Sequence, residues 1–466
     1  MSIFINRYNE LKMLENRFKD KKSEFLIIYG RRRVGKTELI KRFYKDKLHL
    51  YYLCSRENDS LQLQKLVKRT ADFFNEREPV INSWEEFFSY LKEKSNKRLI
   101  VVIDEFPYMV EKNNAIPSLF QLGWDEYLKD SKIFLILLGS SISMMESLLG
   151  YKSPIYGRRT GQIEVNPLKI KDSFKFFPKY DIDKKIEAYS IIGNIPMYLL
   201  EFDDSKSIIN NIRDNMLRAD AILYKEPLFL LREELREPGI YITILENIAD
   251  KPIKMSELST KTNIEVTKLP KYLKILQELK FVKKLTKVTE KKVKTKNTLY
   301  TINDNFFRFW FKFINPNLSD IEGGDKEKVI NIIKSELNSF VGKSFENICK
   351  EFLIDNKSIL PFNFSRIGVW WGYYREGKKR EEVEIDLVAV GDSAIGFFEC
   401  KWQSLNYKKA KEIIHKLIEK AKHVSHEGNK YFGLIAKNIK NKEKLKREGY
   451  LVFDLKDFKK TGWVKR

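Results

Sequence analysis

The pattern G-x-x-x-x-G-K-[ST] occurs at Gly30, Arg31, Arg32, Arg33, Val34, Gly35, Lys36 and Thr37. The two glycines let the backbone curl so that its N–H groups point at phosphate oxygens. Lys36 would reach the β and γ phosphates of a nucleotide, and the Thr37 hydroxyl would ligate Mg²⁺. The pattern therefore predicts a site for a nucleoside triphosphate, ATP, together with Mg²⁺.

Two carboxylates follow the apolar run at residues 99–103. We expect Asp104 to hold Mg²⁺ and Glu105 to polarise the water that attacks the γ phosphate. A single acid often ends a core strand. Two acids combined with the phosphate loop predict hydrolysis of the triphosphate as well as its binding.

Further polar groups could complete this site. The apolar run 133–138 ends in Gly139, Ser140 and Ser141, so that Ser140 or Ser141 could sense the γ phosphate, unless the segment is a plain strand-to-helix turn. Arg158 and Arg159 follow a turn and could stabilise transition-state charge in their own subunit or in a neighbouring one of a homo-oligomer. The alternative is that both arginines are solvated basic residues.

The elements that must position these groups are buried strands and one helix. Residues 25–29 form an apolar run before the loop, and residues 38–43 follow it with helical spacing of their apolar positions. Strand, glycine loop and helix are in the order that a phosphate-binding α/β domain requires. We place this domain at residues 1–165.

Several motifs in the right order resemble the archaeal ATPase family, a group of AAA+/STAND-related P-loop ATPases. They are residues 4–7, Glu10-Leu11, the Arg-Arg-Arg-Val loop, residues 103–106, 138–141 and 157–162. The resemblance implies a helical lid, at residues 166–235, and a winged helix, at residues 236–315. Residues 193–199 resemble the lid motif of the family, with Asn194 where a second glycine is usual.

Composition indicates a multidomain protein with real cores, because 43% of the 466 residues are hydrophobic. We find no run of about twenty uncharged apolar residues and no signal segment, which predicts a cytoplasmic protein with no membrane segment. Cys54, Cys349 and Cys400 are odd in number and far apart, so we expect buried thiols and neither disulfides nor a zinc site.

The net charge makes nucleic acid the first partner to consider. The chain has 87 Lys and Arg against 64 Asp and Glu, a formal charge of +23. A surface this basic attracts polyanions. A general lysine bias would give the same excess, so the charge by itself does not name the partner.

One basic region has the arrangement of a winged helix. Helices are predicted at residues 242–249, from Ser256, and at 264–279, followed by a ribbon of strands at 281–285 and 298–302. The basic loop 289–296 would be the wing. The last helix would enter the major groove of DNA with three lysines, Lys268, Lys271 and Lys274. Such modules also dock proteins or cover ATPase sites.

Charged residues interrupt two short core strands near the end of the chain, at residues 384–390 and 396–402. Side chains alternate along a strand, so Glu399 and Lys401 share one face and Cys400 lies on the other. Buried charges are costly unless they are paired or bind metal. The group of Asp386, Glu399 and Lys401 therefore needs a function or a structural ion pair to explain it.

This arrangement, with Glu346 on a preceding helix, resembles the PD-(D/E)xK restriction-endonuclease-like superfamily. Residues 325–466 as a whole resemble the DUF234 domain. The resemblance implies that Asp386 and Glu399 bind Mg²⁺ or Mn²⁺, that Lys401 activates water, and that Glu346 completes a second metal site. The alternative is a structural ion pair or an inactive inherited fold.

Two aromatic segments, at residues 306–311 and 367–374, could stack on bases, but packing in the core is the favoured interpretation. We expect a basic helix at 405–421 to pack across the sheet, and His423 and His426 to have no metal role. The sequence as a whole predicts an ATPase that acts on nucleic acid, with DNA as the favoured partner, and that carries a nuclease-like domain. The alternatives are an ATP-driven switch or assembly factor that does not cleave, and a sequence-specific regulator.

Overall fold

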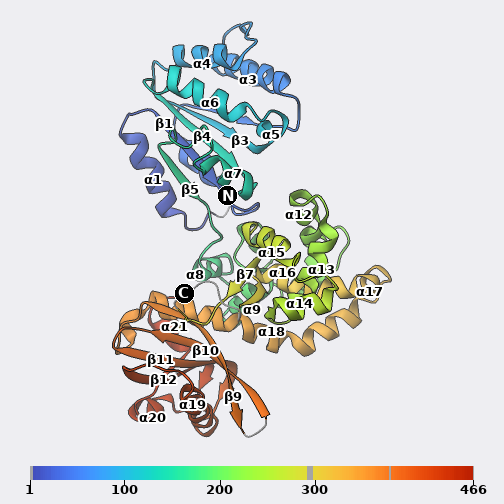
Figure 1. Cartoon of the computed structure of the whole chain (residues 1–466), viewed down its shortest axis with the longest axis vertical. Helices are drawn as coiled ribbons and strands as arrows, with labels where there is room; N and C mark the ends of the chain where they lie inside the picture. The colour runs from blue at the N-terminus through green and yellow to red at the C-terminus, as the bar shows by residue number, and fades with distance from the viewer. Residues whose placement is uncertain (1–3, 291–297, 377–378, 465–466) are drawn as a thin grey trace. The chain divides into compact units, whose positions relative to one another are not determined.

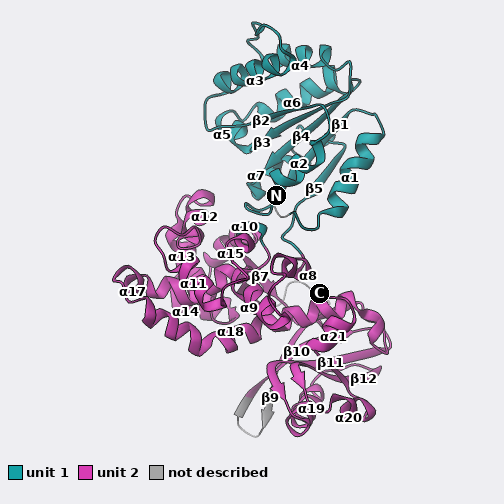
Figure 2. Ribbon diagram, turned by 180° about the vertical axis from the view of Figure 1, so that it is seen from behind, with its two compact units in different colours: residues 1–168, 195–197 teal, residues 169–194, 198–466 magenta. Residues whose placement is uncertain are grey.

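The computed structural model describes residues 4–290, 298–376 and 379–464. The chain divides into two compact units, coloured separately in Figure 2. Unit 1 comprises Met1–Leu168 with Ile195–Met197, and unit 2 comprises Lys169–Asn194 with Tyr198–Arg466. In the described part of the chain, none of the helices has both the length and the hydropathy that a membrane span requires.

A five-stranded sheet forms the centre of unit 1, in the order β2-β3-β4-β1-β5. Figure 1 labels β1, β3, β4 and β5 of this sheet, and Figure 2 labels all five strands. The four pairs of neighbouring strands in this sheet, as far as the structure describes them, are all parallel. Its strands are β1 (Glu24–Tyr29), β2 (His49–Leu53), β3 (Leu99–Asp104), β4 (Ile133–Gly139) and β5 (Gly161–Glu164). Strands β1, β3 and β4 are buried along their whole length, which explains their continuous apolar sequences. The predicted α/β fold with a parallel sheet is confirmed.

Helices cover both faces of this sheet. On one face, α1 (Tyr8–Lys19) and α2 (Lys36–Tyr44) pack against the alternate strand residues Leu26, Ile28 and Val102. On the other face, the strand residues Phe25, Val101 and Ile103 contact helices rich in aromatic residues. These elements are the helices α3 (Asp59–Phe74), α4 (Trp84–Glu93), α5 (Pro107–Lys112), α6 (Ile116–Gly123) and α7 (Ile142–Leu149), and the short π-helix η1 (Trp124–Leu128). The sheet is thus fixed from both sides, and its strand ends are held rigidly.

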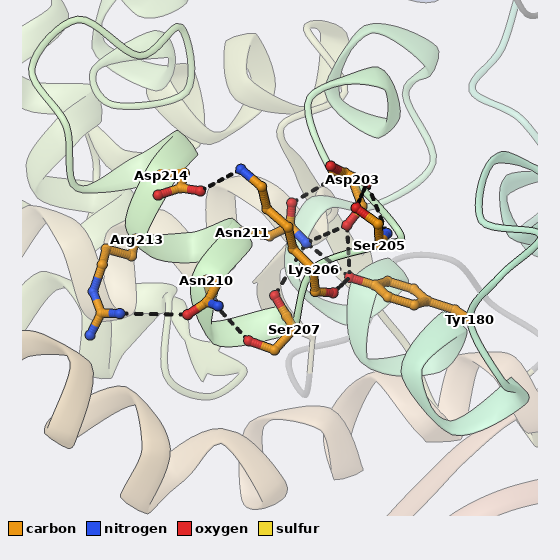
Figure 3. Close-up of polar contacts among 9 residues, drawn as sticks. All are labelled: Tyr180, Asp203, Ser205, Lys206, Ser207, Asn210, Asn211, Arg213 and Asp214. Atoms are coloured by element: carbon orange, nitrogen blue, oxygen red, sulfur yellow. Dashed lines mark hydrogen bonds and ion pairs between the residues drawn. The ribbon is translucent and has the colours of Figure 1, made fainter.

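Unit 2 begins with short helices. They are α8 (Ile170–Ser173), η2 (Phe174–Phe176), α9 (Ile182–Ile192), α11 (Ile208–Met216) and α12 (Glu226–Glu234), and α10 (Pro196–Leu200) lies across the boundary between the units. The fully buried Asn211 of α11 is at the centre of a polar network (Figure 3). Its amide nitrogen donates to the Tyr180 hydroxyl at 2.9 Å and to the Asp203 carbonyl at 2.8 Å, and its amide oxygen accepts from the Asp203 N–H at 2.8 Å. The network fixes the loop that leads into α11.

A module of three helices and three short strands follows. It consists of α13 (Pro238–Ile248), β6 (Ile253–Lys254), α14 (Met255–Thr262), α15 (Leu269–Glu278), β7 (Val282–Leu285) and β8 (Leu299–Ile302). The strands pair antiparallel in the order β6-β8-β7. Helix α15 begins five residues later than the predicted start at 264, because Asn263 takes a left-handed conformation with φ 53° and residues after it form a turn. Most of the predicted wing, residues 291–296, lies outside the described residues.

The first aromatic segment is part of the core. Phe306, Phe307, Phe309 and Trp310 are fully buried, and the Trp310 indole donates to the Tyr224 carbonyl at 2.7 Å. They lie in α16 (Asn305–Phe309) and η3 (Trp310–Ile314), which are followed by η4 (Asn315–Asn317), α17 (Leu318–Glu322) and α18 (Lys326–Asp355). The interpretation as core packing is confirmed.

A second five-stranded sheet ends the chain, in the order β13-β12-β11-β10-β9. Its elements are η5 (Lys357–Ile359), β9 (Arg366–Glu376), β10 (Lys379–Val390), β11 (Ala394–Leu405), α19 (Tyr407–Ala421), β12 (Asn429–Ile439), α20 (Lys442–Arg447), β13 (Leu451–Asp454) and α21 (Leu455–Lys460). Strands β9, β10 and β11 are antiparallel, whereas β11, β12 and β13 are parallel. Residues 379–382 extend β10 although their sequence is polar, because they pair with β9 as a hairpin. Helix α18 packs against β11, so side chains of α18 lie on one face of this sheet.

The three-helix module is joined directly to this second sheet. The Val288 N–H donates to the Val369 carbonyl of β9 at 3.1 Å, and the Lys254 ammonium donates to the Tyr373 hydroxyl at 2.5 Å. Val288 also packs against the buried Trp370 in the apolar cluster of the sheet. The base of the predicted wing is therefore fixed to the edge strand β9.

Candidate nucleotide and phosphodiester sites

The phosphate loop begins where β1 ends, and its two glycines have conformations that favour glycine. Gly30 has φ 153°, and a Cβ atom there would lie 2.3 Å from the Val165 carbonyl oxygen. Gly35 has φ 90° and caps the N-terminus of α2. The loop therefore requires both residues, and it places the helix N-terminus at the position where phosphate would bind.

Lys36 and Arg7 stabilise the loop from two sides. The Lys36 ammonium donates to the carbonyls of Gly30 and Arg31 at 2.9 and 3.1 Å. The buried Arg7 donates from Nη2 to the Val34 carbonyl at 2.8 Å. Arg7 belongs to the family motif at residues 4–7, and no physical reason for an arginine there can be derived from the sequence alone. The structure supplies one, because Arg7 anchors the backbone of the loop.

Thr37 and Asp104 lie together, as expected for two residues that share a metal ion. The Thr37 hydroxyl donates to Asp104 Oδ2 at 3.0 Å, and the Tyr51 hydroxyl of β2 donates to the same oxygen at 2.7 Å. Burial, and then the hydrogen bond to Asp104, raise the pKa of Tyr51, so this hydroxyl remains a donor. A hydroxyl and a carboxylate are hard oxygen ligands that fit Mg²⁺. The sequence interpretation missed Tyr51.

Glu105 and Ser140 also meet, at the ends of β3 and β4. The Ser140 hydroxyl donates to Glu105 Oε1 at 2.7 Å, and the Ser140 N–H donates to Oε2 at 3.3 Å. Glu105 has a left-handed backbone with φ 53°, which is uncommon for a residue with a side chain. A strained acid held by a serine fits the predicted pairing of a catalytic carboxylate with a phosphate sensor.

The two arginines after the sheet contact residues outside the phosphate loop. Arg158 forms an ion pair with Asp125 at 3.0 Å, and Arg159 donates to the Tyr156 carbonyl at 2.8 Å and to Gln162 at 3.0 Å. Both pairs lie on partly exposed surface. These contacts leave the predicted role of the arginines open.

In unit 2, the strands β10 and β11 bring three predicted residues together. The Lys401 ammonium lies 3.2 Å from Asp386 Oδ2 and 2.6 Å from Glu399 Oε2. The Cys400 N–H donates to Asp386 Oδ2 at 2.8 Å. Leu387 of β10 pairs with Phe398 of β11. Asp386 and Glu399 are each one residue beyond this pair, so the two acids lie on adjacent strands at the same level of the sheet.

Burial and neighbouring charges shift the pKa values of Asp386, Glu399 and Lys401 in different directions. Burial, and then the Glu399 carboxylate, raise the pKa of Asp386 to about 6. Burial also acts to raise the pKa of Glu399, but Lys401 and Lys420 overcome it and lower the pKa below its usual range. Burial opposes the charge of Lys401, yet Asp386 and Glu399 raise its pKa above its usual range. The sequence interpretation missed Lys420 of α19, whose ammonium lies 2.6 Å from Glu399 Oε1.

Glu346 of α18 faces the same group but does not complete a metal cluster. Burial, followed by the charge of Asp386, raises the pKa of Glu346 to about 8. Within the described residues, no three His, Cys, Asp or Glu side chains are arranged to hold a metal ion. Two carboxylates still fit Mg²⁺, which commonly binds one or two protein carboxylates and completes its shell with waters and substrate phosphates.

Three cations, Arg308, Lys283 and Lys350, lie near one another, and Arg308 of α16 also interacts with Glu346. Arg308 donates to the Phe340 carbonyl at 3.1 Å and to the Ser344 hydroxyl at 2.7 Å. Burial lowers the pKa of Arg308 to about 10. Burial, and then the charges of Lys350 and Arg308, lower the pKa of Lys283 to about 8. These cations repel one another, so an anion would stabilise the group.

The three cysteines are buried free thiols, as predicted. Cys349 of α18 and Cys400 of β11 interact through their side chains on the face of β11 opposite Glu399 and Lys401. Burial raises the pKa of both thiols, so they remain protonated. They therefore contribute packing between α18 and the sheet.

A parallel sheet with a phosphate loop after β1 and two acids after β3 defines the class of P-loop nucleoside triphosphatases. Residues 4–202 match a family model described as an ATPase domain predominantly from Archaea. Residues 310–413 match DUF234, a model described as archaeal and bacterial proteins of unknown function.

Over nearly its whole length, the chain is similar to an uncharacterized protein of Methanocaldococcus jannaschii. The two are 40% identical over 470 residues, which cover 98% of this chain and all of that protein. The chain therefore belongs to the archaeal ATPase family that carries this ATPase domain together with DUF234. Membership supports ATP binding and ATPase activity.

Shorter and more distant similarities accompany this one. A segment of 45 residues is 51% identical to an uncharacterized ATP-binding protein of M. jannaschii and covers 10% of this chain and 76% of that protein. Among solved structures, a Walker-type ATPase of Pyrococcus abyssi is 20% identical, with TM-score 0.49, over 66% of this chain and 96% of that one. The ORC2 protein of Aeropyrum pernix is 15% identical, with TM-score 0.42, over 68% of this chain and 93% of that one.

Proposed function

We propose that this ATPase acts on DNA, and that its C-terminal sheet cleaves a phosphodiester bond with the help of a divalent metal. The observation that carries the proposal is the position of the Lys401 ammonium between the carboxylates of Asp386 and Glu399. Two hard oxygen ligands beside one ammonium are the groups that metal-dependent phosphodiester hydrolysis needs. ATP hydrolysis in unit 1 would control this step.

In the ATPase step, each polar group of unit 1 has a distinct task. Lys36 would bind the β and γ phosphates, and Thr37 and Asp104 would hold Mg²⁺. Glu105 would orient the attacking water, and its hydrogen bond with Ser140 would report whether the γ phosphate is present. Tyr51 would keep Asp104 oriented toward the metal ion by donating to one of its oxygens.

In the cleavage step, Asp386 and Glu399 would hold Mg²⁺ or Mn²⁺. When bound, the ion would polarise the scissile phosphate and lower the pKa of a bound water. Lys401 would donate a hydrogen bond that orients the attacking water. Arg308, Lys283 and Lys350 would attract the phosphate backbone, since a polyanion would relieve their mutual repulsion.

DNA is the partner that the basic module of unit 2 fits best. The order of its helices and strands is that of a winged helix, and α15 would enter the major groove. The side chain of Lys274 is 77% exposed and that of Lys268 is 62% exposed, so both could exchange their surface ion pairs with Glu278 and Glu265 for contacts with phosphates. The hydrogen bond of Val288 to β9 holds the residues just before the predicted wing against the sheet.

One observation favours a second function, that of an ATP-driven switch or assembly factor without cleavage. Both oxygens of Glu399 are already in ion pairs, Oε2 with Lys401 and Oε1 with Lys420. A structural ion-pair network would have the same geometry. In that case unit 2 would bind DNA or a protein partner, and a homo-oligomer could form around the ATPase units.

The deciding experiment is incubation of plasmid and single-stranded DNA with the protein in Mg²⁺ or Mn²⁺, with and without ATP. We expect metal-dependent cleavage that Asp386→Asn and Lys401→Met abolish. Asp392→Ala, at an exposed acid in the turn between β10 and β11, is the matched control and should cleave normally. Lys36→Ala shows whether ATP controls the cut. Intact ATP hydrolysis without cleavage under any condition would establish the switch and reject the nuclease.

A further inference from the structure

A cavity of about 280 Å³ lies within unit 2, away from both candidate sites. Its wall comes from the segment around α8 and η2, from α9, and from the end of the described chain. The lining residues are Lys171, Asp172, Phe174, Lys175, Pro178, Lys185, Gly462, Trp463 and Val464. The cavity therefore joins three lysines with apolar and aromatic walls.

Lys185 is the unusual member of this wall. The residue is 8% exposed and is one of the residues that line the cavity. Within residues 4–290, 298–376 and 379–464, the ammonium has neither a hydrogen bond nor an ion pair. An unpaired buried charge is costly, and burial accordingly lowers the pKa of Lys185. A bound anion would offset this cost.

The other two lysines already have partners, and this separates their role from that of Lys185. Lys171 forms an ion pair with Asp355 at 2.7 Å, and Lys175 forms one with Asp172 at 2.6 Å. Lys185 is therefore the cation of the cavity that is available for a ligand, while Lys171 and Lys175 add positive potential at its rim.

The apolar wall is rigid and aromatic. The Trp463 indole donates to Asp355 at 3.0 Å, and its ring lies edge-on to Phe174 with a centroid distance of 6.0 Å. A water molecule occupies about 30 Å³ of liquid, so the cavity has room for a group well beyond a single phosphate ion. Its lining suits a ligand with an aromatic or other apolar part next to its charge.

We propose that this cavity binds a small organic anion, with its anionic group on Lys185 and its apolar part against Trp463 and Phe174. The ligand would connect α9 near the start of unit 2 to residues 462–464, which follow α21, and so would stabilise their packing. The site is independent of the proposed cleavage, because it shares no residue with the groups around Lys36 or Asp386.

Isothermal titration calorimetry with phenyl phosphate tests the site directly. The titrations use full-length protein that carries Lys36→Ala, in EDTA, so that neither the phosphate loop nor a metal-bound acidic site contributes. We expect one molecule of phenyl phosphate to bind per chain, and benzyl alcohol and inorganic phosphate to bind more weakly. Lys185→Met should weaken phenyl phosphate binding about tenfold or more, since it removes a charge-assisted hydrogen bond.

Lys184→Met is the matched control, because Lys184 is the neighbouring residue of α9 and is exposed. It should bind phenyl phosphate as the parent does. Equal affinities of the Lys184 and Lys185 variants, or no binding at millimolar phenyl phosphate, would reject the proposal.

A second measurement needs no substitution at Lys185. Acylation of lysines, followed by mass spectrometry, should show that phenyl phosphate protects Lys185 and leaves the labelling of Lys184 unchanged. Unchanged labelling of Lys185 at saturating ligand would also reject the site.

Discussion

Tyr51 donates to the carboxylate that is expected to hold Mg²⁺, and this makes it a positioning residue for ATP hydrolysis. We predict that Tyr51→Phe lowers kcat for ATP hydrolysis about fivefold, since one hydrogen bond to a carboxylate contributes about 1 kcal/mol or more. The affinity for ATP should change less. Steady-state hydrolysis and nucleotide binding measured on the same protein check this.

The neighbouring Tyr52 provides the control. Its hydroxyl donates to the Gln62 carbonyl at 3.1 Å, away from Asp104. Tyr52→Phe should therefore leave kcat nearly unchanged. An equal loss in both variants would mean that the strand, and not the contact with Asp104, determines the rate.

Glu346 should make the stability of unit 2 depend on pH. Its pKa in the folded protein is about 8, above the ordinary value of 4.5, so the folded state binds the proton more tightly than the unfolded state does. This contribution is fully present below about pH 4.5 and is lost as the pH rises toward 8. We predict that Glu346→Gln unfolds a few degrees higher than the wild type at pH 9 and that the difference becomes smaller or reverses at pH 4.

Thermal unfolding of both proteins across this range is the measurement. Glu327→Gln, at an exposed position of the same helix, controls for the loss of a carboxylate from α18. A difference between Glu346→Gln and wild type that stays constant with pH would contradict the assignment.

At the residue scale, the motifs predicted contacts between residues that are close in sequence or that follow the spacing of a known motif. Thr37 meets Asp104, and Lys401 meets Asp386 and Glu399, as the patterns indicated. Tyr51 and Lys420 were missed because their contacts depend on packing with a neighbouring strand or helix. An isolated tyrosine or lysine in a chain with 22 tyrosines and 87 basic residues gives no signal of its own.

At the scale of elements, Asn211 fixes the loop before α11 through hydrogen bonds to Tyr180, Asp203 and Ser207. We predict that Asn211→Ala destabilises unit 2 by about 1–3 kcal/mol, because it removes the hydrogen bonds that a fully buried amide makes to Tyr180, Asp203 and Ser207. Urea unfolding followed by circular dichroism measures the loss. Asn210→Ala, one position earlier and exposed, should be nearly neutral.

Strands with a continuous apolar sequence were predicted well. Strand segments that form only because they pair with a neighbouring strand were predicted less well. Strands β1, β3 and β4 lie within one residue of the predicted apolar runs, because a strand buried on both faces is apolar throughout. Residues 379–382 are polar and give no strand signal, and β10 includes them through its hairpin with β9. The polar network of Asn211 had no sequence pattern that could have predicted it.

At the scale of the whole molecule, Arg158 and Arg159 raise the question of assembly. Their contacts within this chain are to Asp125, Tyr156 and Gln162, so we expect a catalytic arginine to act on a neighbouring subunit. A mixture of Lys36→Ala and Arg158→Ala/Arg159→Ala proteins should then regain ATP hydrolysis that neither has alone. A mixture that stays inactive, together with a monomeric size in ATP, would place the arginines in their own subunit or outside catalysis.

The attachment of Val288 and Lys254 to β9 has a consequence for how a DNA duplex would be processed. It would hold α15, the helix proposed to enter the major groove, at a constant distance from Asp386 and Glu399, the acids proposed to bind the catalytic metal ion. The protein would then measure length along the duplex, and the position of a break would be counted in base pairs from the bound sequence. Cleavage would then produce fragments with uniform ends, whatever bases lie at the break.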